Sequence, residues 1–129
     1  MFKQVHHIGF AVYDLEKAID LMRKVYNIEP ERRIVMSDRE MEAVLFKTGE
    51  TYIEYLAPLS QTSSLTTYLQ EKGEGFHHIA YLVDNIENAK KSMPTDAVIR
   101  ERKSSVGDWE IADIDTKYAL GITSQIIQK

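Results

Sequence analysis

One motif occurs twice in this chain, and the repeat limits the possible folds more than any other feature. The run Val5–Val12 carries a His-His pair that ends at His7, and the run Gly75–Val83 carries a second pair that ends at His78, 71 positions later. Each run is apolar and is followed by a residue that can cap a helix and then by a helical pattern. We therefore expect the chain to be a duplicated unit.

The same spacing relates two further polar residues. Glu54 and Gln125 each lie in the last strand-like run of their half. Glu54 alternates there with apolar and aromatic neighbours, a costly position for an ionisable group unless it is paired or bound to a metal. Four polar residues thus occupy two equivalent pairs of positions.

Length and composition define the broad class. A chain of 129 residues is expected to form one domain, here residues 1–129. A net charge of −4 with both signs interspersed argues against a nucleic-acid partner. No apolar run approaches the ~18 residues that a membrane span needs, and the N-terminus lacks a signal-peptide core, so we expect a cytoplasmic protein without a membrane partner. The absence of cysteine removes disulfides and thiolate ligands.

Periodicity divides both halves in the same way. In the first half, Asp14 is a suitable cap for a helix over residues 15–26, and strands are predicted over residues 5–12, 34–36, 41–47 and 51–56, with Gly49 in the last hairpin. In the second half, Asn85 is the equivalent cap, the helix ends before Pro94, and strands are predicted over residues 75–83, 97–99, 109–114 and 122–128. A short helix capped by Ser64 is expected between the halves.

Each half thus has the order strand, helix, strand, strand, strand. The predicted fold is α+β, with two tandem βαβββ modules, at about residues 1–58 and 75–129, that form a curled mixed sheet around a central cleft. A single strand histidine is usually a hydrogen-bonded structural residue, but the paired positions favour a metal site. Two imidazoles, a carboxylate and an amide oxygen suit Ni, Co, Mn, Fe or Zn with one or two waters.

The motifs resemble those of the vicinal oxygen chelate superfamily, which includes glyoxalase I, methylmalonyl-CoA epimerase, extradiol dioxygenases and bleomycin resistance proteins. The resemblance spans nearly the whole chain and is carried by residues 5–12, 52–59 and 75–83. It implies that His7 and His78 are metal ligands, whereas His6 and His77 are interpreted as packing or supporting residues. Glu54 matches the second ligand position, which is Glu in glyoxalases and Gln in epimerases.

The run Gly121–Ile126 matches the closing motif of the family. Gln125 departs from the family pattern, because most members have Glu at its position. That Glu is both ligand and proton-transfer base in the epimerase and the glyoxalase, and an amide cannot take up a proton at neutral pH. Glu54 is then the best candidate base, and replacing Gln125 by Glu is expected to raise activity. Glu42 could be a second carboxylate in the cleft, the alternative being a solvated strand position. The run Arg100–Lys103 could attract coenzyme A or another phosphate, the alternative being a solvated loop.

Two classes of function remain open. The first is a glyoxalase-like, metal-dependent lyase or isomerase, of the methylmalonyl-CoA epimerase or lactoylglutathione lyase type, that moves a proton next to a carbonyl. Its substrate would be a small molecule such as a thioester or a hemithioacetal. The second is a non-catalytic small-molecule binding protein of the same fold, which the loss of the fourth Glu favours. We expect a homodimer in either case. A dioxygenase is disfavoured, because its iron site usually has a carboxylate where Gln125 stands.

Overall fold

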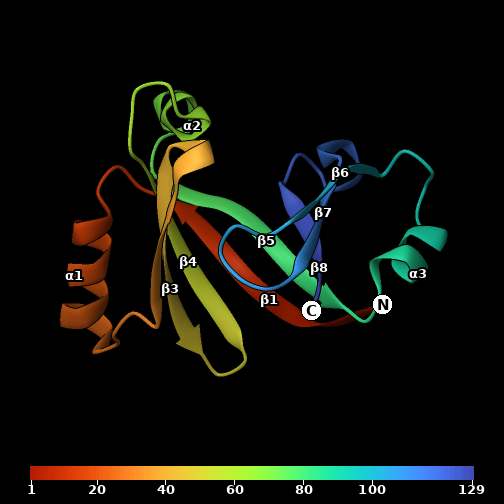
Figure 1. Cartoon of the computed structure of the whole chain (residues 1–129), viewed down its shortest axis with the longest axis horizontal. Coiled ribbons are helices and arrows are strands. Elements are labelled where there is room, and N and C mark those ends of the chain that lie inside the picture. Colours follow the sequence, from red (N-terminus) through yellow and green to blue (C-terminus); the bar gives the residue numbers. More distant parts are fainter. The chain divides into compact units, whose positions relative to one another are not determined.

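The structure is a computed structural model that describes residues 1–129, and it contains eight strands and three α-helices (Figure 1). The strands are β1 (Phe2–Ala11), β2 (Arg32–Met36), β3 (Met41–Thr48), β4 (Thr51–Pro58), β5 (Gly75–Val83), β6 (Val98–Lys103), β7 (Glu110–Ile114) and β8 (Ser124–Gln128). The helices are α1 (Leu15–Tyr26), α2 (Ser64–Lys72) and α3 (Ile86–Lys91). None of the helices is both long enough and apolar enough to cross a membrane.

The strands form a mixed sheet in the order β2-β3-β4-β1-β5-β8-β7-β6. Strand β5 pairs with β8 in parallel, whereas β2 with β3, β3 with β4, β6 with β7 and β7 with β8 are antiparallel. The predicted α+β class and the two strand-helix-three-strand modules are confirmed. By its internal contacts the chain divides into two compact units, residues 9–77 and residues 1–8 with 78–129.

In the unit of residues 9–77, helix α1 packs on one face of β3 and β4 (Figure 1). The helix begins where Asp14 accepts a hydrogen bond from the Glu16 amide at 2.9 Å, and it ends at Asn27 in the left-handed conformation (φ 54°). Its apolar stripe buries a cluster of side chains against the strands: Leu15, Ile19, Met22, Val44, Phe46 and Ala57. These residues are the core of this unit.

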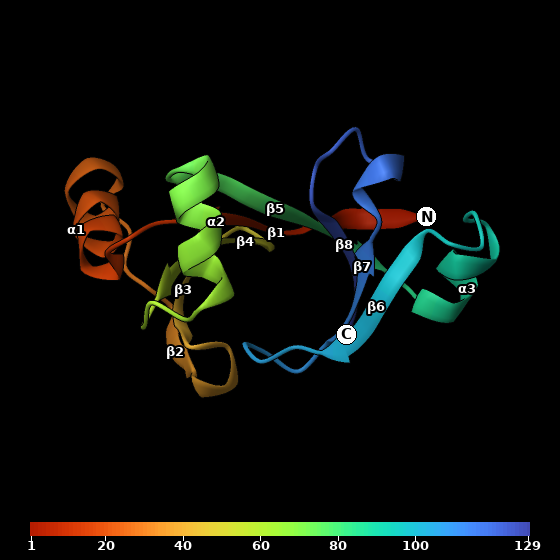
Figure 2. The same ribbon diagram turned by 90° about the horizontal axis from the view of Figure 1, so that it is seen from above.

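In the unit of residues 1–8 and 78–129, strands β6, β7 and β8 lie side by side, and α3 packs on one of their faces (Figure 2). Asn85 caps α3, as predicted from its equivalence to Asp14, and accepts from the Asn88 amide at 2.9 Å. Under α3 lies one apolar cluster, made by Val83, Ile86, Ala89, Ala112 and Ile126. The opposite face carries a second cluster, made by Ala80, Leu82, Ile111 and Ile127 with Trp109 against it.

Several boundaries differ from the sequence prediction: β1 and β2 begin earlier than expected, at Phe2 and Arg32, and β8 begins later, at Ser124. Helix α2 is capped by Ser63, whose hydroxyl accepts from the Leu65 amide at 3.3 Å, and not by Ser64. Strand β4 continues to Pro58. Strand β6 continues to Lys103, through residues predicted to form a charged loop, because its alternating charges find partners on neighbouring elements.

The buried position of Phe46 predicts a large effect on stability. Phe46 is 0% exposed, and truncation to Ala would leave a cavity beneath α1, so Phe46→Ala is expected to lower the free energy of unfolding by ~3–5 kcal/mol. Phe76→Ala is the matched control, because Phe76 also lies on a strand but is 45% exposed. Urea denaturation of both variants measures the difference. Equal losses would contradict this description of the core.

Candidate functional site

A pair of buried imidazoles is the centre of the candidate site. His7 lies on β1 and His78 on β5, and their Nε2 atoms are 2.9 Å apart. Both residues belong to the same compact unit, and both are at most 5% exposed. The structure thus brings together the two histidines that the repeat predicts to be equivalent.

The surroundings of His7 favour its neutral form. Burial lowers the pKa of His7 well below its usual value, and positive charge on His78, His6 or Arg102 would lower it further. A neutral imidazole keeps one nitrogen lone pair available, which a metal ligand requires. The site is therefore prepared to bind a cation at neutral pH without first losing a proton from His7.

His6 supports His7 from the same strand. The Nδ1 atoms of His6 and His7 are 2.8 Å apart, and the His6 ring packs edge-on against Trp109 with the ring centres 4.7 Å apart. If the Nδ1–H of His7 donates to His6, the Nε2 of His7 is free of a proton and can act as a ligand. These contacts match the packing or supporting role predicted for His6. His77 lies in the other unit and packs edge-on against Tyr68.

The spacing of the imidazole nitrogens fits a shared metal ion. Two nitrogens that each lie about 2.1 Å from a metal at a right angle are about 3.0 Å apart, whereas a tetrahedral arrangement separates them by about 3.4 Å. The observed distance between His7 and His78 is 2.9 Å. A hydrogen bond between the two rings has the same length, so the distance shows that both nitrogens can reach one ion but does not define the geometry of its ligands.

Gln125 lies on the same face of its unit as His78. It pairs with Ala80 across the parallel strands β5 and β8, and alternation along β5 places Ala80 on the face of His78. Gln125 is 7% exposed, and its Nε2 donates to Asp113 Oδ1 at 3.0 Å. The amide nitrogen is thus engaged, and the amide oxygen remains as the group that can bind a cation.

Glu54 lies on β4, in the unit of residues 9–77. It is 5% exposed and pairs with Leu45 across β3 and β4, so its side chain points to the same face as Leu45. The carboxylate is therefore in the costly position that its apolar and aromatic neighbours in the strand indicate. Its predicted role as ligand and base stays a proposal.

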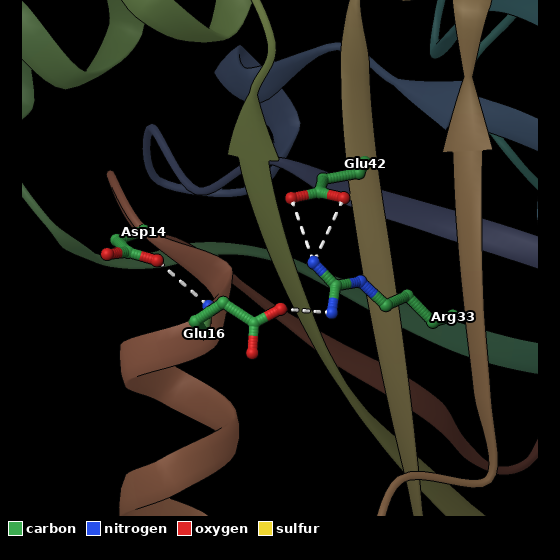
Figure 3. A network of polar contacts seen from close by, with 4 residues as sticks. All are labelled: Asp14, Glu16, Arg33 and Glu42. Atoms are coloured by element: carbon green, nitrogen blue, oxygen red, sulfur yellow. Dashed lines mark hydrogen bonds and ion pairs between the residues drawn. The ribbon is translucent and has the colours of Figure 1, made fainter.

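Glu42 does not share the face of Glu54. Val44, which alternates with Glu42 along β3, packs beneath α1, so the Glu42 carboxylate points to the helix-covered face. There it accepts hydrogen bonds from Arg33 at 3.3 and 3.4 Å, and Arg33 also bonds Glu16 in the first turn of α1 (Figure 3). The hypothesis of a second carboxylate beside Glu54 is therefore wrong for Glu42, which joins helix to sheet.

Asp113 was not predicted as a site residue, and the basic residues beside it lie on a strand and not in the expected solvated loop. Asp113 is 8% exposed, and its carboxylate accepts from Arg100 Nε at 2.8 Å and lies 3.5 Å from Arg102 Nη2. Both arginines lie on β6, next to β7, and are not in a solvated loop. The alternation of charges from Arg100 to Arg102 was a signal that the strand begun by Val98 and Ile99 continues, and it was missed because no apolar residue follows Ile99 in the strand.

These features agree with the comparison with known proteins. The family model "Glyoxalase/Bleomycin resistance protein/Dioxygenase superfamily" matches residues 6–112, and the chain belongs to this family. Its named relatives include epimerases. The mitochondrial methylmalonyl-CoA epimerase of Mus musculus is 34% identical over 87 residues, which are 67% of this chain and 49% of that protein. The ethylmalonyl-CoA/methylmalonyl-CoA epimerase of Cereibacter sphaeroides is 30% identical over 94 residues, which are 72% of this chain and 70% of that protein.

Solved structures show the same fold. A methylmalonyl-CoA epimerase from Mycobacterium tuberculosis superposes with a TM-score of 0.85 and 20% identity, over 98% of this chain and 88% of that one. A point variant of the Streptomyces coelicolor epimerase, in complex with 2-nitronate-propionyl-CoA, superposes with a TM-score of 0.86 and 21% identity, over 100% and 99% of the chains. The chain spans about half the length of the mammalian relatives that it matches in sequence.

The buried histidines predict a loss of stability in mild acid. Burial, with a smaller contribution from Lys129, lowers the pKa of His6 from 6.5 to about 4. The unfolded chain therefore binds more protons than the folded chain between these values, and stability should fall as the pH drops from 6.5 toward 4. Urea midpoints between pH 7 and 5.5 measure this slope, which His6→Gln should reduce. A midpoint that does not change with pH would contradict the neutral state of the buried imidazoles.

Proposed function

We propose that this protein is a metal-dependent lyase or isomerase that moves a proton at a carbon next to a carbonyl group. The observation that carries the proposal is the buried pair of His7 and His78, whose Nε2 atoms are 2.9 Å apart and within reach of one ion, with the pKa of His7 held low by burial. Membership of the glyoxalase superfamily and the similarity to named epimerases support it.

The proposed ligands are His7, Glu54, His78 and Gln125. Support for Glu54 comes from the repeat, since Glu54 occupies on β4 the position of Gln125 on β8. The Val12 amide donates to the Leu56 carbonyl at 2.9 Å, which brings the end of β1 beside β4 within one unit. Glu54 thus lies on the strand beside β1, as Gln125 lies on the strand beside β5.

Divalent Ni, Co, Mn, Fe or Zn would supply Lewis acidity, which lowers the free energy of the anion formed when a proton leaves a carbon beside a carbonyl. Glu54 would act as the base. Its carboxylate accepts the proton as the carbon–hydrogen bond breaks, and the electron pair is delocalised onto the carbonyl oxygen of the substrate. Glu54 can then return the proton to another atom of the substrate, as in other isomerases and lyases, whereas inversion in an epimerase needs a second proton donor on the opposite face of the carbon, a role that Gln125 cannot fill. Burial keeps bulk water from competing for that proton.

The proposed substrate is a small molecule with a thioester or a hemithioacetal group. The names of the relatives favour an acyl-CoA thioester with a carbon branch next to the carbonyl. A homodimer and a cytoplasmic location are further predictions from the sequence, as is the single domain over residues 1–129.

A second candidate function is binding of a small molecule without catalysis. Two observations favour it: Gln125 cannot accept a proton, and Glu42 faces α1 and is not beside Glu54. Glu54 would then be the single carboxylate among the proposed ligands. The metal and substrate experiments below distinguish the two candidates.

The histidine pair predicts metal stoichiometry. Protein purified without chelators is expected to hold about one divalent transition metal per chain, and His78→Ala should lose most of it, because a methyl group cannot replace an imidazole ligand. His77→Ala is the matched control, since His77 precedes His78 in β5 but packs against Tyr68. Elemental analysis after gel filtration measures the content. Equal metal in His78→Ala and the wild type would remove His78 from the site.

The proposed base predicts hydrogen exchange. The metal-loaded protein should catalyse deuterium uptake from heavy water into branched acyl-CoA thioesters or 2-oxoaldehyde hemithioacetals, and Glu54→Gln should reduce the rate by ~10²–10⁴-fold. Glu42→Gln should retain the rate, because Glu42 lies on the helix-covered face. Mass spectrometry follows the uptake. If no substrate exchanges with any of the metals, but one raises the melting temperature and is recovered unchanged, the binding function is the correct one.

A further inference from the structure

Gln125 has a buried acidic neighbour that its counterpart Glu54 lacks. Asp113 lies directly opposite Gln125 across the antiparallel strands β7 and β8. In the other module, the residue opposite Glu54 across β3 and β4 is Leu45. The two proposed oxygen ligands are therefore equivalent in the repeat, but one faces a carboxylate and the other faces an apolar side chain.

The charge of Asp113 determines which end of the Gln125 amide faces it. Arg100 and Arg102 approach the carboxylate from β6, and an ionised carboxylate can only accept hydrogen bonds. The NH₂ end of Gln125 must then point to Asp113, as the 3.0 Å contact from Nε2 to Oδ1 shows, and the amide oxygen points away. An isolated amide could adopt either orientation, because its two ends are similar in shape.

We propose that Asp113 is a positioning residue that orients Gln125, so that the amide oxygen is presented as a ligand next to His78. The inference rests on the proposed role of Gln125 in metal binding. Arg100 and Arg102 complete the arrangement, because they offset the cost of burying the Asp113 carboxylate and hold it on the face of β7 that Gln125 shares.

The same contact explains why residue 125 is an amide. A glutamate at this position would place two carboxylates opposite each other in a buried pair, which is unfavourable. The expectation from the sequence that Gln125→Glu alone restores a family carboxylate is therefore revised. A glutamate at position 125 requires a neighbour that donates a hydrogen bond, which Asp113→Asn would provide through its NH₂ group.

The first test measures the affinity of the purified full chain for Ni²⁺ by titration calorimetry at pH 7. Asp113→Leu removes the acceptor and should weaken binding by about 10–100-fold, as loss of a residue that orients a ligand typically does. Asp113→Asn can offer Gln125 either end of its amide, so it should weaken binding by less than Asp113→Leu does. Unchanged affinity in Asp113→Leu would overturn the inference, and so would a larger loss in Asp113→Asn than in Asp113→Leu.

The second test is a double-mutant cycle on the metal-free protein. Gln125→Glu should lower the melting temperature at pH 7 by roughly 5 °C, and combining it with Asp113→Asn should restore most of that loss. A loss that is independent of residue 113 would overturn the inference. If the wild type binds no Ni²⁺, the proposed function fails, whereas the cycle still reports whether Asp113 and Gln125 are coupled.

Discussion

A polar side chain can be buried in a sheet only when a partner replaces the hydrogen bonds that it made to water. The candidate site depends on this requirement. On one face of strands β5 to β8, His78 contacts His7, and Gln125 contacts Asp113, which in turn contacts Arg100. The opposite face of these strands is apolar and packs against α3. The strands thus place paired polar side chains on one face, beside the apolar cluster of Ala80, Leu82, Ile111 and Ile127, while α3 covers the other face.

The repeat made much of this predictable. Matching spacing identified the two histidines, the helix caps and the order of elements in each half, because these features depend on local sequence. Asp113 was missed for a physical reason: β3 and β4 are joined by a tight turn at Gly49, whereas residues 115–123 connect β7 to β8. Asp113 is the counterpart of Leu45, because Leu45 lies opposite Glu54 and Asp113 lies opposite Gln125. The longer connection in the second half changes the spacing between these two counterparts, so the spacing that relates the histidines does not relate Leu45 to Asp113.

The side of the sheet that a strand residue occupies was harder to predict than the strand itself. Glu42 and Glu54 lie on adjacent strands in the same unit, and both alternate with apolar residues. Only the position of α1, which covers Val44, shows that the face of Glu42 is the packed one. An alternating pattern divides a strand into two faces, but the element that covers one of them must be known before either face can be assigned to a site.

The contact between Asp113 and Gln125 limits how the two halves of a duplicated chain could have diverged. If the ancestral halves were alike, position 125 first held a carboxylate, as its counterpart Glu54 still does. A second carboxylate at position 113 could not easily have coexisted with it, since the two would face each other across β7 and β8. The order of substitutions then matters: the amide has to arise before, or together with, the acid. Residues 113 and 125 should therefore vary as a pair among descendants of the same ancestor, and the acid cannot be transplanted into a related chain by itself.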